Sequence, residues 1–158
     1  MANFKRMTAA FTDGLSAMPS MTWPEGAVQS FLTGAVLVAA SNAAAVATAD
    51  PTLGTVLGIA EGPATGTTAA DCRFVPALPH ITFEGTLDIP AGTYVLAAAA
   101  LGLKCELQVT SGIFYLEQDQ TTNTRVIVVG FKDPIGTVSP RVYFKFLRGV
   151  SLFDVAGA

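Results

Sequence analysis

The stretch TGAVLVAASNAAAVATAD, residues 33–50, decides the fold, because its hydropathy suits either a membrane-spanning helix or a pair of strands. A spanning helix needs about 20 strongly apolar residues, with basic residues nearby to set its orientation. This stretch instead contains several polar side chains and has no Lys or Arg at either end. The apolar segments AVLVAA and AAVATA surround the turn-forming letters SNA. The sequence therefore predicts a strand hairpin, with a buried Ala-rich helix as the main alternative.

The following segment, GTVLGIAEG at residues 54–62, also indicates a strand. Its three glycines are spaced four apart, like the small residues through which membrane helices pair. Glu61 and Pro63 would interrupt such a helix, so we assign the glycines to turns and to close backbone approach. GAVL at Gly34 and GTVL at Gly54 are similar, but the likeness is too short to indicate an internal repeat.

RVYFKFLRGV, residues 141–150, gives the clearest strand signal in the chain. Its side chains alternate along the segment, with Val142, Phe144 and Phe146 on one face and Arg141, Tyr143 and Lys145 on the other. About seven to nine short segments of this kind, with turns every ~8–12 residues, are typical of a β-sandwich or barrel. We therefore predict an all-β fold, a jelly-roll-like sandwich or barrel, over residues 31–158.

Residues 1–30 differ from the rest, and we predict an N-terminal arm or docking segment there. Their apolar side chains are spaced three or four apart, which would suit a short helix. Pro19 and Pro24 disfavour a long helix and favour an extended path. Packing of residues 4–15 on the domain itself is the alternative. The residues expected to contact a neighbouring subunit are Phe4, Phe11, Met18, Met21 and Trp23.

Composition indicates a protein whose surface is partly covered by a partner. The chain has 158 residues, of which 51% are hydrophobic and 13% charged, where about 25% charged is usual. The formal net charge is −3 and the basic residues are scattered, which argues against nucleic acid as a partner. A membrane partner is not expected either, so a protein surface remains.

The two cysteines, Cys72 and Cys105, lie far apart in the sequence and show no metal-ligand spacing. We expect two buried, reduced thiols, with a disulfide as the alternative. The N-terminal residues lack the apolar core of a secretory signal, because Asp13 and threonines stand where that core would be. We therefore expect a protein that is assembled in a cytoplasm.

Catalytic chemistry is not indicated by the sequence. His80 is the single histidine, and no phosphate-binding glycine loop or nucleophile elbow is present. Glu84 with Asp88, or Glu117 with Asp119, could form a carboxylate pair for glycoside hydrolysis. A solvated strand edge and loop is the expected place for these acids. We predict that the protein is not an enzyme and holds neither a cofactor nor a metal ion.

A resemblance sharpens this prediction. The run at residues 34–66, VPALPHITFEGTL at 75–87 and RVYFKFLRG at 141–149 are similar to segments of capsid cement, or decoration, proteins of tailed bacteriophages. The likeness covers about residues 31–150. It implies a jelly-roll or related β-fold and a dimer or trimer on the capsid exterior. Such proteins bridge neighbouring major capsid subunits against the pressure of packaged DNA.

This resemblance implies the major capsid protein and a second copy of the chain as partners, and it assigns no site residues. A host-glycan-binding β-module of a phage tail or baseplate is the alternative function. A hydrolase with a concealed site is a third alternative. Binding to preformed expanded capsids would distinguish the first from the second, because a glycan module binds sugar without a capsid.

Overall fold

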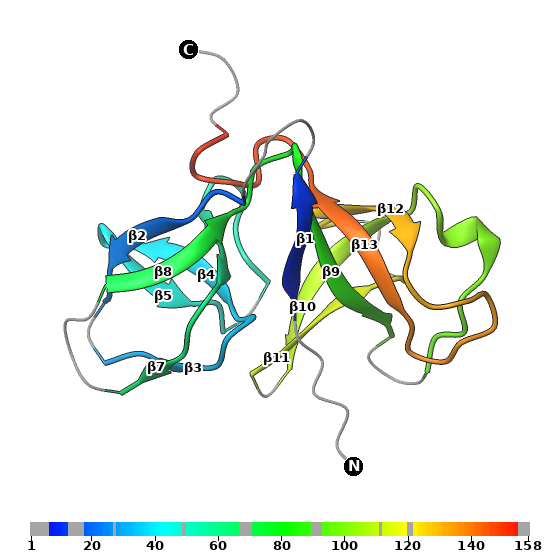
Figure 1. Ribbon diagram of the computed structural model, residues 1–158, viewed down its shortest axis with the longest axis horizontal. Helices are drawn as coiled ribbons and strands as arrows, with labels where there is room; N and C mark the ends of the chain where they lie inside the picture. The colour runs from blue at the N-terminus through cyan, green and yellow to red at the C-terminus, as the bar shows by residue number, and fades with distance from the viewer. Residues whose placement is uncertain are drawn as a thin grey trace.

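The computed structural model describes residues 7–12, 18–26, 28–48, 50–66, 71–89, 93–110, 112–119 and 122–154. These residues form an all-β molecule of two lobes that lie side by side (Figure 1). Within them the one helical element is η1, a single 3-10 turn at Ala98–Ala100. No helix in this part of the chain is long and apolar enough to cross a membrane. The predicted all-β sandwich-or-barrel class is confirmed.

The first lobe is a five-stranded sheet in the order β2-β8-β6-β4-β5. Its strands are β2 (Met21–Pro24), β4 (Val36–Ala40), β5 (Ala43–Val46), β6 (Val56–Ala60) and β8 (Asp71–Pro76). All four ladders are antiparallel. A parallel bridge from Glu25 to Ala44, with the Gly26 N–H donating to the Ala44 carbonyl at 2.8 Å, joins the two edges. We call this closed sheet the first barrel.

The hairpin predicted at residues 33–50 is confirmed as β4 and β5. Its turn is made by Ser41 and Asn42, whose φ angles are 50° and 65°. Two successive residues with positive φ give a turn whose twist matches that of the flanking strands, and Asn accepts this conformation more readily than most residues.

The second lobe contains β9 (Ile81–Asp88), β10 (Lys104–Thr110), β11 (Ile113–Glu117), β12 (Val126–Phe131) and β13 (Arg141–Phe146). The order is β9-β11-β10-β12-β13, and β13 pairs with β9 again, which closes a second barrel. The β9–β11 pair is parallel and the other pairs are antiparallel. An additional strand, β1 (Thr8–Thr12), lies antiparallel to the first half of β9.

The two barrels have the same connectivity, which makes the chain an internal structural repeat. In each barrel the first strand pairs with the last strand and, in parallel, with the third, and the second and third strands form a hairpin. β5, β6 and β8 begin at residues 43, 56 and 71, while β11, β12 and β13 begin at 113, 126 and 141, a constant interval of 70 residues. The β4–β5 register recurs in β10–β11 at this interval.

Few side chains are identical at the 70-residue interval. The identical pairs between residues 36–76 and 106–146 are Leu37/Leu107, Ser41/Ser111, Thr52/Thr122, Val56/Val126, Gly66/Gly136, Thr67/Thr137 and Phe74/Phe144. The two leucines, the two valines and the two phenylalanines are all fully buried. The sequence likeness is therefore concentrated at buried positions, where the barrels need the same core volume. It is too sparse to reveal the repeat from the sequence alone.

Each barrel also has a short two-stranded ribbon. One strand of the ribbon follows the first strand of the barrel, and the other precedes its last strand. In the first barrel the ribbon is β3 (Ser30–Phe31) with β7 (Ala64–Thr65). In the second barrel residues 94–96 pair with residues 137–139 through the Val95–Val138 bridge. Gly66 and Gly136, with φ of 80° and 94°, turn the chain at equivalent positions.

The C-terminal segment, residues 147–154, returns to the first barrel. The Val150 carbonyl accepts hydrogen bonds from the N–H groups of Gly54 and Val56, at 3.0 and 3.3 Å. The Phe153 ring stacks on Phe74 and meets the edge of Trp23, with ring centroids 6.2 and 5.8 Å apart. This segment and β1 extend the contacts of each barrel beyond its own strands.

The N-terminal segment enters the fold through strands in the part that the structure describes. β1 covers Thr8–Thr12, where the residue spacing had suited a helix, and β2 supplies one strand of the first barrel. Extended residues gain hydrogen bonds to neighbouring strands here, which a short helix of this composition could not match. The role of residues 1–30 as a docking segment for another subunit stays a prediction.

Candidate interaction surface

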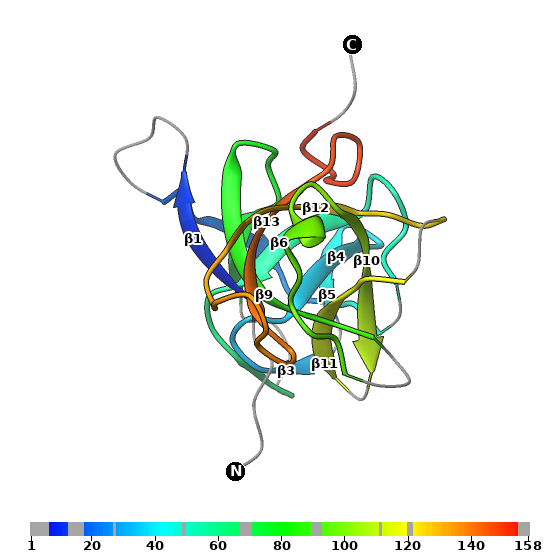
Figure 2. The same cartoon turned by 90° about the vertical axis from the view of Figure 1, so that its right-hand side faces the viewer.

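The second ribbon presents the main exposed apolar surface of the second barrel. Val95 and Val138 lie directly opposite each other and are 51% and 54% exposed, and Ile135 beside them is 61% exposed. Leu101, just after η1, is 58% exposed. The ribbon and η1 lie at the end of the second barrel that points away from the first (Figures 1 and 2).

Local hydrogen bonds fix this ribbon. The Leu96 N–H donates to the Thr137 carbonyl at 2.9 Å, and the Ser139 N–H donates to the Tyr94 carbonyl at 2.8 Å. The Leu96 side chain is buried, so its neighbour Val95 points outward, because successive side chains of an extended segment face opposite sides. The turn at residues 133–136 then carries Ile135 at its tip.

Asp88, at the end of β9, ties together the two segments of the ribbon. Its Oδ1 accepts hydrogen bonds from the backbone N–H groups of Ile89 and Tyr94, and its Oδ2 accepts one from the Ser139 hydroxyl at 3.0 Å. The carboxyl is buried, where an unpaired charge would be costly, and these donors compensate for its burial. Asp88 therefore positions the exposed valines.

The first ribbon has a similar construction. Phe31 is buried and anchors β3, whereas Leu32, which follows it, is 57% exposed and Val28, shortly before it, is 61% exposed. In Figure 1 this ribbon lies at the lower side of the first barrel. The molecule therefore carries two related ribbons, each anchored by one buried apolar residue and bordered by exposed ones.

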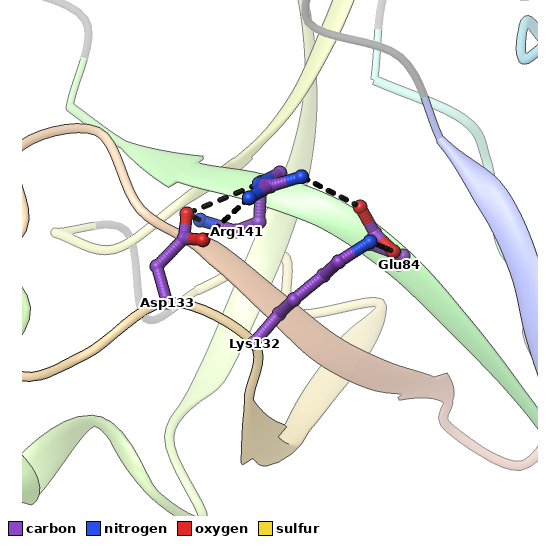
Figure 3. A network of polar contacts seen from close by, with 4 residues as sticks. All are labelled: Glu84, Lys132, Asp133 and Arg141. Atoms are coloured by element: carbon purple, nitrogen blue, oxygen red, sulfur yellow. Dashed lines mark hydrogen bonds and ion pairs between the residues drawn. The ribbon is translucent and has the colours of Figure 1, made fainter.

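Charged residues border the second ribbon, but they neutralise one another. Arg141 donates from its backbone N and Nε to Asp133 Oδ2, at 2.8 and 3.1 Å, and from Nη2 to Oδ1 at 2.7 Å. Lys132 Nζ lies 2.5 Å from Glu84 Oε2, and Arg141 also approaches Glu84, at 3.9 Å (Figure 3). Hydrogen bonds from Arg141 lower the pKa of Asp133. The border of the apolar surface therefore carries two acidic and two basic side chains, whose charges cancel.

The five residues predicted from the sequence as subunit contacts are only partly described. Met18, Met21 and Trp23 are partly buried against the protein's own core. Trp23 Nε1 donates to the Asn42 carbonyl at 3.1 Å. The backbone of Phe11 pairs with Thr82, its side chain lies outside the described residues, and so does Phe4. The contact of these five residues with another subunit stays a prediction.

Three of the residues considered for catalysis, His80, Glu84 and Asp88, have separate surroundings. His80 is exposed in the turn before β9. Glu84 and Asp88 lie on the same strand but have separate partners, the first in the ion-pair network and the second in the ribbon. Within the described residues no group of three or more His, Cys, Asp or Glu side chains could hold a metal ion.

The second acid pair and the cysteines have different surroundings. Glu117 and Asp119 share a hydrogen bond. The expected solvated position is wrong for Asp88 and Glu117, which are 4% and 1% exposed. Asp88 accepts hydrogen bonds from both segments of the second ribbon, and Glu117 lies opposite Glu106 and near Asp50 of the first barrel. Cys72 and Cys105 are both buried and free, as expected from the sequence.

Sequence reasoning missed the ribbon residues Val95, Ile135 and Val138. Their signal is the absence of charge over residues 93–103 and 134–140, but such runs are equally common in buried strands. Only the pairing of the two segments shows that these side chains face outward. Comparisons with models of protein families, with curated proteins and with solved structures found no match.

Proposed function

We propose that this protein is a virion structural protein that binds the outer surface of a tailed-bacteriophage capsid and stabilises it by bridging major capsid subunits. The observation that carries the proposal is the repeated barrel with its repeated apolar ribbon. A bridge between two copies of one capsid protein needs two similar docking surfaces on the same molecule. The sequence resemblance to capsid cement proteins supports the same function.

The energetics of the ribbons suit this role. Burial of an exposed Val, Leu or Ile side chain is worth about 1.5–3 kcal/mol before the costs of association. One ribbon therefore supports only weak binding. Two ribbons on one molecule, repeated over a symmetric shell, convert weak contacts into stable coating. The charges of the bordering ion-pair network already have partners, which reduces the desolvation cost at the interface.

The proposal includes the remaining features expected of a cement protein. The chain assembles in the host cytoplasm, acts as a dimer or trimer on the capsid exterior and has no enzymatic activity. The major capsid protein and further copies of the chain are its partners. Neither nucleic acid nor a membrane is one.

A binding assay with expanded capsids tests the proposal. Purified capsids of the source phage, stripped of accessory proteins, are mixed with the full chain and sedimented. We expect saturable binding by the wild type, at least tenfold weaker binding by Val138→Asp, and an unchanged thermal midpoint for that variant. Ile113→Asp, a change of a 44% exposed residue at the β10–β11 hairpin, is the matched control and should bind normally.

Three results would contradict the proposal or part of it. Failure of the wild type to bind capsids would reject the function. Normal binding by Val138→Asp would reject the ribbon as the docking surface. Binding of the isolated protein to host glycans without a capsid would favour the tail or baseplate module.

The N-terminal contacts need a separate variant. Deletion of residues 1–25 would remove β2 from the first barrel and would confuse folding with docking. Deletion of residues 1–6 removes Phe4 and leaves both β1 and β2 in place. We expect this shorter deletion to fold normally and to bind capsids more weakly. Equal binding would exclude a docking role for these six residues.

A further inference from the structure

Carboxyl groups from both barrels meet where the barrels touch. Asp50 belongs to the loop between β5 and β6 of the first barrel, whereas Glu106 of β10 and Glu117 of β11 lie opposite each other in the second. The Asp50 and Glu106 side chains share a hydrogen bond, and so do the Glu117 and Asp119 side chains. Two carboxyl pairs, Asp50 with Glu106 and Glu117 with Asp119, thus lie beside each other across the junction.

The two glutamates are unusually placed for charged residues. Glu106 is 3% exposed and Glu117 is 1% exposed, and each has one carboxyl oxygen without a hydrogen-bond partner, as does Asp50. The positions 70 residues earlier, in the first barrel, hold the apolar residues Val36 and Ala47. The barrel itself therefore does not require acids at these positions, and a different explanation is needed for them.

A hydrogen bond between two carboxyl groups requires that one of them carry a proton. Burial, the hydrogen bond to Asp50 and the charges of Asp50 and Glu117 raise the pKa of Glu106 to about 7, against an opposing hydrogen bond from Asn123. Burial and the hydrogen bond to Asp119 also raise the pKa of Glu117, while Gln108 opposes the rise. Loss of these protons would place like charges side by side at two glutamates that are almost fully buried.

Two basic residues, Arg125 and Lys104, flank these four acids. Arg125 binds backbone carbonyls, and Lys104 faces solvent. Arg125 donates from Nε to the Pro51 carbonyl at 2.8 Å and from Nη1 to the Thr124 carbonyl at 3.3 Å. Lys104, two residues before Glu106 on β10, is exposed. The Arg125–Pro51 bond itself joins the second barrel to the first, next to Asp50. The same loop also continues to Gly54, which bonds to the C-terminal segment.

We propose that the Asp50–Glu106–Glu117–Asp119 cluster is a pH-sensitive latch between the two barrels, closed while its carboxyl groups share protons and released when they ionise. Release frees the loop that contains Asp50 and Pro51 and leaves each barrel folded. Because the closed junction holds the proton of Glu106 more tightly than an open one does, rising pH favours the open junction. Most of this change falls between pH 4.5 and about 7.

Hydrogen exchange of the full chain at pH 5 and pH 8 tests the latch, with rates corrected for intrinsic exchange at each pH. Protection of the junction amides of Gly54 and Val56, which donate to Val150 of the C-terminal segment, should fall by about tenfold or more relative to that of Phe144 in the second barrel. Glu106→Gln keeps the shape of the side chain and cannot ionise, so the fall should disappear. Glu61→Gln, a change of an exposed acid paired with Arg73, should leave the fall unchanged.

The latch is wrong if the junction keeps its protection relative to the core at pH 8, or if Glu106→Gln shows the same fall as the wild type. Asp50→Asn replaces the partner carboxyl of Glu106 in the first barrel with an amide, which can donate a hydrogen bond to the ionised glutamate. This variant should also abolish the fall in protection. This second variant decides the question if Glu106→Gln does not fold. None of these measurements requires a capsid, so the latch can be rejected without rejecting the proposed function, and the reverse also holds.

Discussion

Phe74 and Phe144 occupy the same position in two barrels of the same connectivity, and both rings are fully buried. Phe74 stacks on Phe153 of the C-terminal segment, whereas Phe144 packs between Phe83 and Phe146 with centroids 5.7 Å from each. The same core position is therefore completed by different partners. Each barrel therefore has its own aromatic core around an equivalent phenylalanine.

Truncation of either phenylalanine should be comparably costly. We expect Phe74→Ala and Phe144→Ala each to lower the free energy of unfolding by about 3–5 kcal/mol, because each leaves a large cavity in a closed barrel. Phe131→Ala, a change of a half-buried ring on β12, is the control and should cost less. Urea unfolding measures all three. A small effect at one equivalent position only would show that the two cores are not comparable.

Gly58 tests the backbone packing of the first barrel. A Cβ at Gly58 would overlap the Val75 carbonyl, 2.8 Å from its carbon atom and closer still to its oxygen. Backbone atoms of the neighbouring strand cannot move aside without breaking the ladder. We expect Gly58→Ala to cost several kcal/mol, about as much as the severe class of point mutations, or to prevent folding. Gly62→Ala meets no atom within 4 Å and should stay within about 0.5 kcal/mol of the wild type.

Phe153 provides an optical probe of the C-terminal segment. It contacts the edge of Trp23, the only tryptophan of the chain. Phe153→Ala should expose the indole to water, shift its fluorescence to longer wavelength and cost about 1–3 kcal/mol. Phe131→Ala again serves as the control and should leave the emission maximum unchanged. An unshifted spectrum in Phe153→Ala would mean that the aromatic contact does not shield Trp23.

Asp133 should contribute to stability only while it is ionised. Its pKa is lowered from 3.8 by hydrogen bonds from Arg141, so the folded state binds this proton less tightly than the unfolded state. The contribution is therefore fully present above about pH 4 and is lost as the pH falls further. We expect Asp133→Asn to cost about 0.5–1 kcal/mol at pH 7, because Arg141 is half exposed, and to cost less at pH 3.

Thermal unfolding of the wild type, Asp133→Asn and Asp71→Asn at these two pH values checks this prediction. Asp71 is exposed on β8, at the position equivalent to Arg141, and its replacement serves as the control. A cost for Asp133→Asn that is the same at both pH values would show that the ionised form contributes nothing.

The cysteines should react slowly in the folded protein. Burial raises the pKa of Cys105 to about 12, and burial with the nearby charges of Glu25 and Asp71 raises that of Cys72. Only the thiolate is the nucleophile, so few reactive groups exist at neutral pH. We expect no rapid labelling by a disulfide reagent in buffer and two equivalents in denaturant. One equivalent of fast labelling, or a disulfide in fresh protein, would contradict the prediction.

Local patterning in the sequence was sufficient to predict β4, β5, β6 and β13. Alternation in RVYFKF predicted β13, and the letters SNA predicted the turn between β4 and β5. Burial of both thiols was also predicted. Each of these features depends on neighbours a few residues apart in the chain, through side-chain alternation or through turn conformation.

Tertiary structure alone decided how the strands close and what their side chains meet. The two barrels depend on pairs such as Tyr143 with Glu84, far apart in sequence, and the likeness between the barrels survives mainly at buried positions such as Phe74 and Phe144. The sequence by itself determined which segments extend and which residues turn them. It did not determine that Val95 faces outward or that Glu106 is buried beside Asp50, because side-chain alternation offers two faces and only long-range pairing decides which face is covered.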